Sequence, residues 1–440
     1  MRPKTKLPKT LLQEISYLRS LRKAWSNLNK SNPESRGISG ITIRAFQANL
    51  DNNLKSIQRK LRKKKYQFSK LRAIAIHKHG KDPRPLRIAE IRDRVVLKAI
   101  SDKITPILES VYPINNEASF AYLSERNIKK AFERIKQLFN DGKRIAFKTD
   151  IRKFFDTVNQ EELLETKIFT VLPDHSLNEL LKRGLTLEIG NIHELSQNEL
   201  KYFEESSSGI PQGNALSPLL SNIFLVDFDK ELLNNEYGLV RYADDLVVMC
   251  KDEKEAYMVY ELCRSLLKEK GLEIHDLSRK KDSKTKIVHP TQEPLQFLSI
   301  CFDGKNLWPT RSKYIDLRKK IRDVCDIRNR DTQKIPDLLT SCEHLLRGWI
   351  AAFYFTNVER YFPKIDDYIN ESLSYALRVR DWKLKKLVDD KLSDEQRLFS
   401  GIPLCMEILT ELREKKKNSN YHLTNNIEVK GNEDNILEPR

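Results

Sequence analysis

Two adjacent carboxylates, Asp244 and Asp245, interrupt a stretch of chain that is otherwise apolar and rich in β-forming residues. The runs on either side of them, 239–243 and 246–250, are short, which predicts two strands of a hairpin with both acids at its tip. Carboxylates held together in apolar surroundings repel each other and resist losing water unless a cation neutralises them. The pair therefore indicates either a divalent-metal site or, as for most isolated Asp-Asp pairs, an ordinary polar turn.

A third carboxylate is needed to complete a metal site, because neighbouring strand residues face opposite ways and Asp244 and Asp245 cannot contribute equally. Asp150 is the candidate, since residues 144–150 alternate like a strand, with Phe147 on one side and Asp150 at the end of the other. Three such acids suit phosphoryl transfer with two Mg²⁺ ions, one activating a hydroxyl nucleophile and one holding a triphosphate and stabilising the leaving pyrophosphate. Hard oxygen ligands favour Mg²⁺ over softer metals.

Apolar residues at helical spacing predict the elements around these acids. The stripe over 43–61 predicts one amphipathic helix. Ser217 and Pro218 are predicted to be the N-cap and the first turn of a buried helix. The region after about residue 305 is predicted to be mostly helical, with a long apolar stripe over 336–353 that a proline opens.

The charge balance points to a polyanionic partner. Lys and Arg number 79 against 62 Asp and Glu, which gives a net charge of +17 and a pI of about 9.4. Nucleic acid is the leading candidate for that partner. Part of the excess is a run at the end of the first predicted helix, which is either a solvated face or a nucleic-acid-binding site that grips phosphates: Arg62, Lys63, Lys64 and Lys65.

The sequence shows no sign of a membrane or secreted protein. The six cysteines are scattered without a C-x-x-C pair, so we expect them to be reduced and buried. The basic N-terminus never reaches the apolar run of a signal peptide, and no stretch approaches the roughly 20 apolar residues of a membrane span. With 440 residues, 39% of them hydrophobic, the chain can form one large or two moderate domains. These features predict a cytoplasmic protein with no membrane association.

Three boxes that contain or flank the acids resemble those of reverse transcriptases, and they occur in the correct order. Residues 241–245, Arg-Tyr-Ala-Asp-Asp, resemble the Tyr-x-Asp-Asp box, and 148–156 resemble the box with the first metal-binding Asp. Residues 208–222 resemble the Pro-Gln-Gly motif. Fainter matches to group II intron and related bacterial enzymes lie at 83–88, 93–94, 284–286, 297–298 and 347–349.

Two departures from the intron-encoded pattern separate this chain from much of the family. Ser299 follows Phe297 and Leu298, where intron-encoded proteins usually have Gly. Nothing matches the Cys-rich endonuclease module that many of them carry, or the Val-Thr-Gly signature of retron enzymes. What remains resembles free-standing bacterial reverse transcriptases, including the abortive-infection and phage-defence groups.

The resemblance implies roles for the residues in these boxes. Asp150 and Asp244 would bind the metal ions, with Asp245 assisting and the backbone carbonyl of Ile151 as a further ligand. Lys284 would donate a proton to the departing pyrophosphate, or is an ordinary basic loop residue.

Five more residues are expected at the incoming nucleotide. Arg84 and Lys78 would neutralise the triphosphate, unless they are solvent-facing cations. Gln212 would lie against the nucleotide and the templating base, and Gly213 would let the backbone approach closely, although both fit a simple turn. Phe155 would stand under the sugar as a steric gate against a ribose 2′-hydroxyl, or else be a core aromatic as Phe154 is expected to be.

The family fold is an α+β right-hand polymerase with fingers, an antiparallel-sheet palm and a helical thumb. We assign 1–70 to a basic helical N-terminal extension and 71–304 to the fingers and palm. A helical thumb-like domain would cover 305–414, and the polar, Asn-rich segment 415–440 would be a mobile tail.

The leading hypothesis is an RNA-directed DNA polymerase that makes a DNA product from deoxynucleoside triphosphates. Its RNA template would be a dedicated noncoding RNA, and its role antiphage defence, which rests on family analogy. One alternative is a retron or group II intron mobile-element enzyme. Another is a splicing cofactor that only binds structured RNA, which three clustered acids disfavour. The sequence makes no prediction of the oligomeric state, the primer or the identity of the template.

Overall fold

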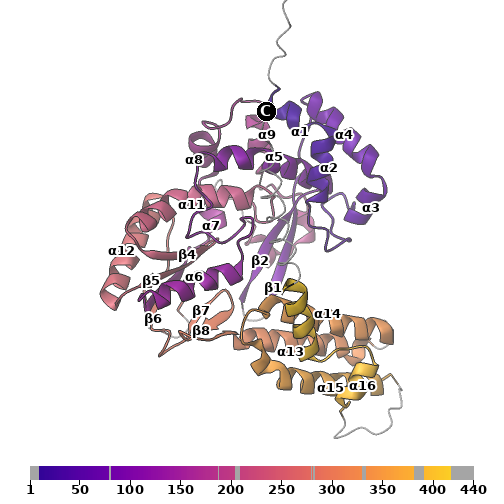
Figure 1. Ribbon diagram of the computed structural model, residues 1–440. Coiled ribbons are helices and arrows are strands. Elements are labelled where there is room, and N and C mark those ends of the chain that lie inside the picture. Colours follow the sequence, from indigo (N-terminus) through magenta and orange to yellow (C-terminus); the bar gives the residue numbers. More distant parts are fainter. Residues whose placement is uncertain are drawn as a thin grey trace, which may run out of the picture. The chain divides into compact units, whose positions relative to one another are not determined.

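The structure, a computed structural model, describes residues 9–78, 81–186, 188–203, 209–278, 280, 283–329, 333–380 and 391–417. The chain forms two compact units, Met1–Val288 and His289–Arg440 (Figure 1). This division falls before residue 305, at which the sequence analysis begins the thumb-like domain, and the four domain ranges stay predictions. Of the predicted tail, residues 418–440 lie outside the described residues, whereas 415–417 end a helix that starts at residue 405.

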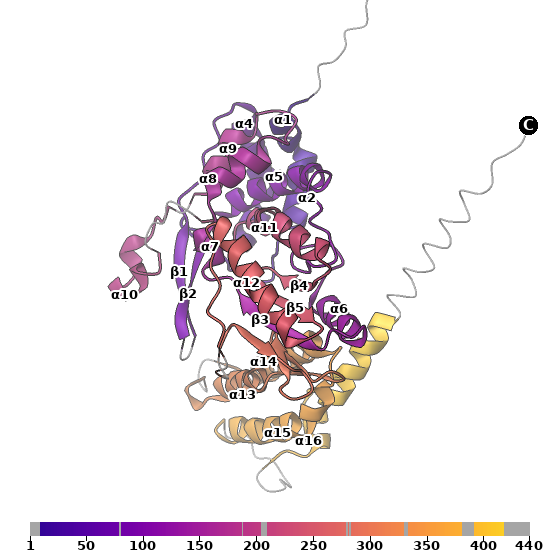
Figure 2. The same ribbon diagram turned by 90° about the vertical axis from the view of Figure 1, so that its left-hand side faces the viewer.

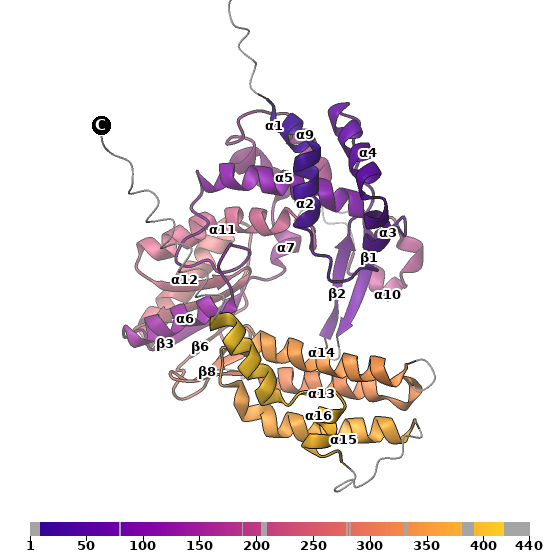
Figure 3. The same cartoon turned by 45° about the vertical axis from the view of Figure 1, so that its right-hand side comes forward.

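Helices α1 to α5 lie within residues 11–109 of the first unit (Figure 3). Helices α1, α2 and α4 pack against α5, and α3 packs against α4. Their apolar residues belong to the same hydrophobic core as the rest of the unit. The bounds are α1 (Leu11–Ile15), α2 (Leu18–Ser26), α3 (Ile43–Ala48), α4 (Leu50–Arg62) and α5 (Ile91–Glu109).

The prediction of one helix over 43–61 is wrong, because α3 and α4 are separated at Asn49, whose φ is −125°. The side chain of Asn53 donates to the Phe46 carbonyl at 3.0 Å, and that of Asn52 donates to the Asn49 side chain at 2.8 Å. Asparagine side chains compete with the hydrogen bonds of the helix backbone, which explains a break within a continuous apolar stripe.

A four-stranded antiparallel sheet in the order β4-β5-β3-β6 forms the centre of the first unit. Helix α6 packs against β4 and β5, α12 against β3 and β5, and α11 against β4. Since strand residues alternate, Phe147 and Val248 face the core beneath these helices, whereas Asp150 and Asp245 lie on the other face. The bounds are β3 (Ile145–Asp150), β4 (Gly238–Tyr242), β5 (Asp245–Cys250), β6 (Lys286–Val288), α6 (Ile128–Asn140), α11 (Ser217–Asn234) and α12 (Glu253–Glu269).

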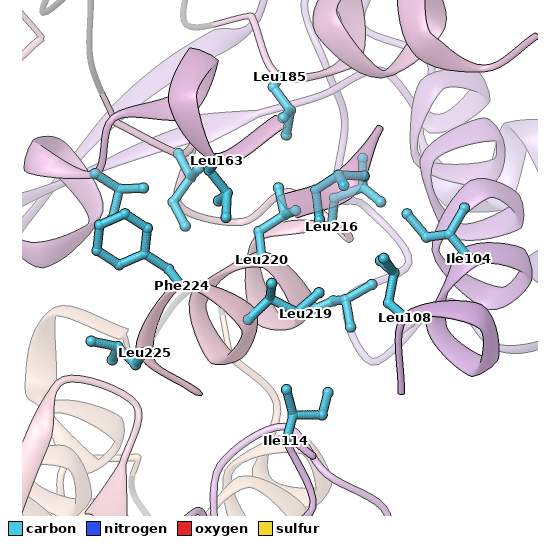
Figure 4. Packing of buried hydrophobic residues seen from close by; sticks show 14 of the residues in the cluster. Ile104, Leu108, Ile114, Leu163, Leu185, Leu216, Leu219, Leu220, Phe224 and Leu225 are labelled. Atoms are coloured by element: carbon cyan, nitrogen blue, oxygen red, sulfur yellow. The ribbon is translucent and has the colours of Figure 1, made fainter. Parts of the chain in front are cut away.

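Helix α11 is buried along most of its length, as its sequence predicts, and Figure 4 shows Leu219, Leu220 and Leu225 of this helix in the same hydrophobic cluster as Ile104 and Leu108 of α5. The predicted N-cap is wrong: Leu216 occupies that position, and Ser217 is the first helical residue. The Ser217 hydroxyl instead donates to the Pro211 carbonyl at 2.7 Å, which closes the loop before the helix.

Two strands, β1 (Arg72–Lys78) and β2 (Lys81–Ile88), form a separate antiparallel hairpin. Helix α10 lies beside it (Figure 2), where Ala73, Ile189 and Phe203 make a small cluster apart from the main core. The remaining helical segments of the unit connect the hairpin, the sheet and α11. They are α7 (Phe154–Thr157), α8 (Gln160–Leu163), a π-helical turn (Leu164–Ile168), α9 (Asn178–Gly184), a 3₁₀ turn (Ile192–Glu194) and α10 (Gln197–Leu200).

The second unit begins with three short antiparallel strands and continues as helices. Helix α13 packs against α14 and α15. The helix predicted from the apolar stripe over 336–353 is confirmed as α14, with the proline in its first turn. The bounds are β7 (Leu295–Phe297), β8 (Ile300–Phe302), β9 (Leu307–Pro309), α13 (Arg311–Cys325), 3₁₀ turns (Ile327–Asn329 and Val358–Tyr361), α14 (Ile335–Phe353), α15 (Phe362–Arg378) and α16 (Asp394–Phe399).

Helices combined with antiparallel sheets make this an α+β fold, as the sequence predicts. All six cysteines are buried and free, which agrees with the expectation for reduced thiols. Among the described helices, none has the length and apolar character that a membrane crossing requires.

Candidate active site

The turn between β4 and β5 carries the adjacent acids. Tyr242 pairs with Asp245, so the two turn residues are Ala243 and Asp244, and Asp245 is already the first residue of β5. Ala243 has a φ of +59°, a conformation that costs a non-glycine residue on the order of 1 kcal/mol. Strain of this kind is kept only where surrounding contacts enforce it, so the turn is held rather than relaxed.

The strand register brings the third acid to this turn. Asp150, the last residue of β3, pairs directly with Asp245 across the sheet. The backbone N–H of Ile151 donates to the Asp244 carbonyl at 3.0 Å, which ties the end of β3 to the turn. Three carboxylates from two separate boxes of the sequence therefore lie together at one end of the two central strands, β3 and β5.

Burial and mutual repulsion make the Asp244 and Asp245 carboxyls hard to ionise. Burial raises the pKa of Asp245 to about 6, and the Asp244 and Asp150 carboxylates add to the rise. The pKa of Asp244 is also raised, first by burial and then by Asp150, while the cations of Arg84 and Lys284 oppose the rise. Such a site is stabilised by added positive charge.

The Asp150 carboxylate already has two basic neighbours, Lys284 and His275. Lys284 Nζ donates to Asp150 Oδ2 at 2.7 Å, and His275 Nε2 lies 3.7 Å from Asp150 Oδ1. Asp150 Oδ1 is nevertheless a buried atom without a hydrogen-bond partner. Lys284 thus lies at the carboxylates, as its expected role requires, but it faces Asp150 and would have to release it to meet a pyrophosphate.

The donor chemistry of this cluster fits divalent cations. An orphaned, buried carboxylate oxygen on Asp150 and two carboxyls with raised pKa are what a hard cation would satisfy. As the side chains stand, the described part of the chain contains no group of three or more His, Cys, Asp or Glu residues close enough to hold a metal ion.

Two residues expected at the nucleotide, Arg84 and Gln212, contact each other near these carboxylates. Arg84 Nε on β2 donates to the Gln212 side-chain oxygen at 3.3 Å, and the Arg84 charge acts on Asp244. Arg84 is exposed and Gln212 partly exposed, so both can meet a ligand. The structure thus connects the β1–β2 hairpin, the Pro-Gln-Gly loop and the carboxylates.

Two glycines of the Pro-Gln-Gly loop lie in different surroundings. Gly213 has a φ of +95°, which favours glycine, and a side chain there would meet only the Arg87 carbonyl at 3.6 Å, an ordinary contact. At Gly209 an added Cβ would lie 2.8 Å from the Phe155 carbonyl. The N–H of Ile210 donates to that same carbonyl at 2.7 Å. Phe155 is therefore fixed to this loop through its backbone.

The two phenylalanines after Asp150 lie in different surroundings. Phe154 is 1% exposed and packs edge-on against Phe155 and Phe224, with ring centroids 5.3 and 6.2 Å apart. Phe155 is only partly buried. This difference is the one expected if Phe154 belongs to the core and Phe155 reaches a ligand.

For Lys78 and for the basic run 62–65, the described residues show no contact with the carboxylates. The side chain of Lys78 lies outside the described residues. Arg62 is the last residue of α4, and Lys63, Lys64 and Lys65 follow it, with a φ of +54° at Lys64. All four cations are exposed, which fits a solvated face and a phosphate-binding site equally.

Sequence reasoning missed Tyr122 and His275. The pKa of the Tyr122 hydroxyl is raised by partial burial and by the charge of Asp244, and the residue is 53% exposed. No local pattern marks it. His275 follows Ile274, whose antiparallel bridge with Ile151 places the next residue opposite Asp150, and this pairing is not contained in any local pattern.

Comparisons with known proteins give two family matches. Residues 76–302 match the family described as reverse transcriptase (RNA-dependent DNA polymerase). Residues 316–393 match the group II intron, maturase-specific domain.

The chain is also similar to individual proteins over part of its length. Protein YkfC of Escherichia coli (strain K12) is 28% identical over 329 residues, which cover 66% of this chain and 80% of the relative. The group II intron-encoded protein LtrA of Lactococcus lactis subsp. cremoris is 29% identical over 231 residues, 52% of this chain but 35% of LtrA. A chain of a partial Cas6-RT-Cas1–Cas2 complex is 26% identical, with a TM-score of 0.36, covering 59% of this chain and 42% of that chain.

Proposed function

Since this chain belongs to the reverse transcriptase family of RNA-dependent DNA polymerases, we propose that it extends a primer on an RNA template with Asp150, Asp244 and Asp245 as its catalytic acids. The observation that carries this proposal is the register in which Asp150 pairs with Asp245, one residue from Asp244. Deoxynucleoside triphosphates would be the substrates and DNA the product.

Two Mg²⁺ ions, held by Asp150, Asp244, Asp245 and the Ile151 carbonyl, would supply an activated primer hydroxyl and a neutralised leaving pyrophosphate. Bound cations would lower the raised pKa of Asp244 and of Asp245 and so favour the ionised carboxylates, since burial and repulsion are what raise it. Lys284, released from Asp150, would then be free to donate a proton to the pyrophosphate.

The residues around the carboxylates would bind and orient the nucleotide. Arg84, which is exposed and already hydrogen-bonded to Gln212, would neutralise the triphosphate, and Lys78 is proposed to assist it. Gln212 would contact the nucleotide and the templating base, with Gly213 providing the turn. Tyr122, exposed beside Asp244, would contact the primer end or the nucleotide.

The biological setting is the finer part of the proposal. We infer, from resemblance to free-standing bacterial enzymes, that the template is a dedicated noncoding RNA and the role antiphage defence in the cytoplasm, where deoxynucleotides and RNA occur. A second candidate, a group II intron-type enzyme that binds intron RNA through residues 316–393, is supported by the maturase-domain match. Sequencing the nucleic acid that copurifies with the protein separates the two: intron RNA would support the second, and one discrete noncoding RNA with its DNA copy the first.

The catalytic assignment is tested by primer extension on one RNA template with Mg²⁺ and deoxynucleotides. Asp244→Asn and Asp150→Asn each remove the charge of a metal ligand at nearly constant volume, so extension should fall to background while RNA binding is retained. Asp141→Asn, which changes an exposed carboxylate at the end of α6, is the matched control. Extension by Asp244→Asn at the wild-type rate would refute the metal assignment.

A further inference from the structure

A fully buried ion pair lies beneath the turn that carries Asp244. Arg241, on β4, and Asp229, on α11, both have side chains with no solvent exposure. The guanidinium Nε and Nη2 donate to the two carboxylate oxygens at 2.6 and 2.5 Å. This two-point contact fixes the plane of the guanidinium group as well as its position.

The remaining guanidinium hydrogens bond a second residue of α11 and two further parts of the unit. Nη1 donates to the Asn222 side-chain oxygen at 3.1 Å and to the Ala243 carbonyl at 3.3 Å, and Nη2 also donates to the Ser119 hydroxyl at 3.1 Å. Five hydrogen bonds match the five N–H donors of an arginine. Arg241 therefore links α11 and the segment around Ser119 directly to the turn.

The bond to Ala243 acts on the strained part of the turn. Ala243 has a φ of +59°, and its neighbour Asp244 is held on the other side by the N–H of Ile151. The backbone of Arg241 is fixed as well, because its N–H donates to the Ala118 carbonyl and its carbonyl accepts from Phe120. A rigid frame thus surrounds the two peptide groups that orient the Asp244 side chain.

Stability alone does not account for this arrangement. A buried ion pair repays its lost hydration only in part, and replacing both partners with apolar residues is often neutral or stabilising. An apolar pair, however, has no donor for the Ala243 carbonyl.

We propose that Arg241 is a positioning residue, which holds the Ala243 carbonyl and so fixes Asp244 for metal binding, with Asp229, Asn222 and Ser119 orienting its guanidinium. This inference rests on the proposed function, because it concerns the use of Asp244 as a metal ligand. Partners that orient metal ligands typically change metal affinity or activity by about 10- to 100-fold when they are removed.

Two variants test the role of Arg241. Arg241→Lys keeps the charge beside Asp229 but loses the fork of donors. The double variant Arg241→Met/Asp229→Leu replaces the pair with apolar residues, so no buried charge is left alone. For both, the Mg²⁺ concentration that gives half-maximal extension should rise severalfold and kcat should fall roughly tenfold or more, while the KM for deoxynucleotides and the affinity for primed RNA stay unchanged.

Arg397→Lys is the matched control in the second unit. Arg397 is also fully buried, with an ion pair to Asp366 at 2.6 Å and a bond to the Pro403 carbonyl at 2.5 Å, but it lies outside the unit that contains the carboxylates. It should lower the unfolding temperature without moving the Mg²⁺ half-saturation point.

The outcomes separate the inference from the proposed function. A wild-type protein that extends no primer would refute the proposed function itself. An active wild type, with an unchanged Mg²⁺ half-saturation point in the folded Arg241 variants, would overturn the positioning role alone. A shift equal to that of Arg397→Lys would reduce Arg241 to a structural residue.

Discussion

Asp245 is buried beside two other carboxylates, and burial raises its pKa to about 6. A carboxyl whose pKa is higher in the folded protein than in the unfolded chain destabilises the fold when it is ionised. The cost is present in full above about pH 6 and disappears as the pH falls through 6 towards the ordinary value of 3.8. Asp245, a proposed metal ligand, thus weakens the metal-free fold when it is ionised.

Removal of this charge should therefore stabilise the protein. We expect Asp245→Asn, in the absence of divalent cations at pH 7.5, to raise the free energy of unfolding by on the order of 2 kcal/mol. The difference should shrink at pH 5, where the wild-type carboxyl is protonated. Urea unfolding at both pH values measures it, with Asp141→Asn as the control. A variant less stable than wild type at pH 7.5 would contradict the prediction.

Phe155 carries the prediction of sugar choice. If it is the steric gate, Phe155→Ala should make room for a 2′-hydroxyl and raise the use of ribonucleotides relative to deoxynucleotides. The measurement is the ratio of kcat/KM for the two nucleotide classes on one primed RNA.

The neighbouring aromatic is the control for this experiment. Phe154 is buried against Phe155 and Phe224, so Phe154→Ala should cost about 3–5 kcal/mol of stability without changing the ratio. An unchanged ratio in a folded Phe155→Ala protein would reject the gate.

At the scale of elements, the turn between β7 and β8 has a serine, Ser299, at a position with positive φ where intron-encoded proteins usually have glycine. Phe297 pairs with Ile300, so Leu298 and Ser299 are the two turn residues. Their φ values are +47° and +67°, and positive values at both positions are those of a type I′ turn, which favours glycine. Ser299 is the residue at which intron-encoded proteins usually have Gly, so the serine occupies a conformation suited to the residue it replaces.

Ser299→Gly should accordingly stabilise the second unit. Removing the strain of a serine in the left-handed conformation should raise the free energy of unfolding by about 1–2 kcal/mol. The greater conformational freedom of glycine in the unfolded chain should lower it by about 0.4–1 kcal/mol, so a smaller net gain remains. Thermal unfolding should show the gain. The same change at Ser312, in the first turn of α13, should instead destabilise. A loss of stability on Ser299→Gly would refute the strain.

At the scale of the whole molecule, the net charge of +17 predicts RNA binding that weakens with salt. The four exposed cations at the end of α4, Arg62, Lys63, Lys64 and Lys65, are proposed to contribute to it. Each phosphate they contact adds about 0.7–0.9 to the slope of log affinity against log salt concentration. Their reversal to Glu should therefore flatten that slope.

The control must change the total charge equally. Four other exposed cations of the first unit, in and just before α12, serve this purpose: Lys251, Lys254, Arg264 and Lys268. Their reversal should flatten the slope less. The slopes are measured by filter binding from low to high salt. Equal slopes for the wild type and the α4 variant would show that residues 62–65 are a solvated face that does not contact RNA.

The sequence by itself determined the strand that ends at Asp150, the hairpin that carries Asp244 and Asp245, the buried helix α11 and the helix α14. Each of these follows from residue patterns within one short segment, because alternation and helical spacing are local properties. The three boxes that resemble the reverse transcriptase family are likewise local patterns, each contained in one short segment.

Only the tertiary structure decided how these pieces meet. It alone showed the break at Asn49, the contact of Lys284 with Asp150, 134 residues away, and that of Arg241 with Ser119, 122 residues away. It also placed Tyr122 beside Asp244. A side chain's partner across such a separation depends on strand register and helix packing, which no local pattern contains, and the buried charge of Arg241 is explained only by the partners that folding brings to it.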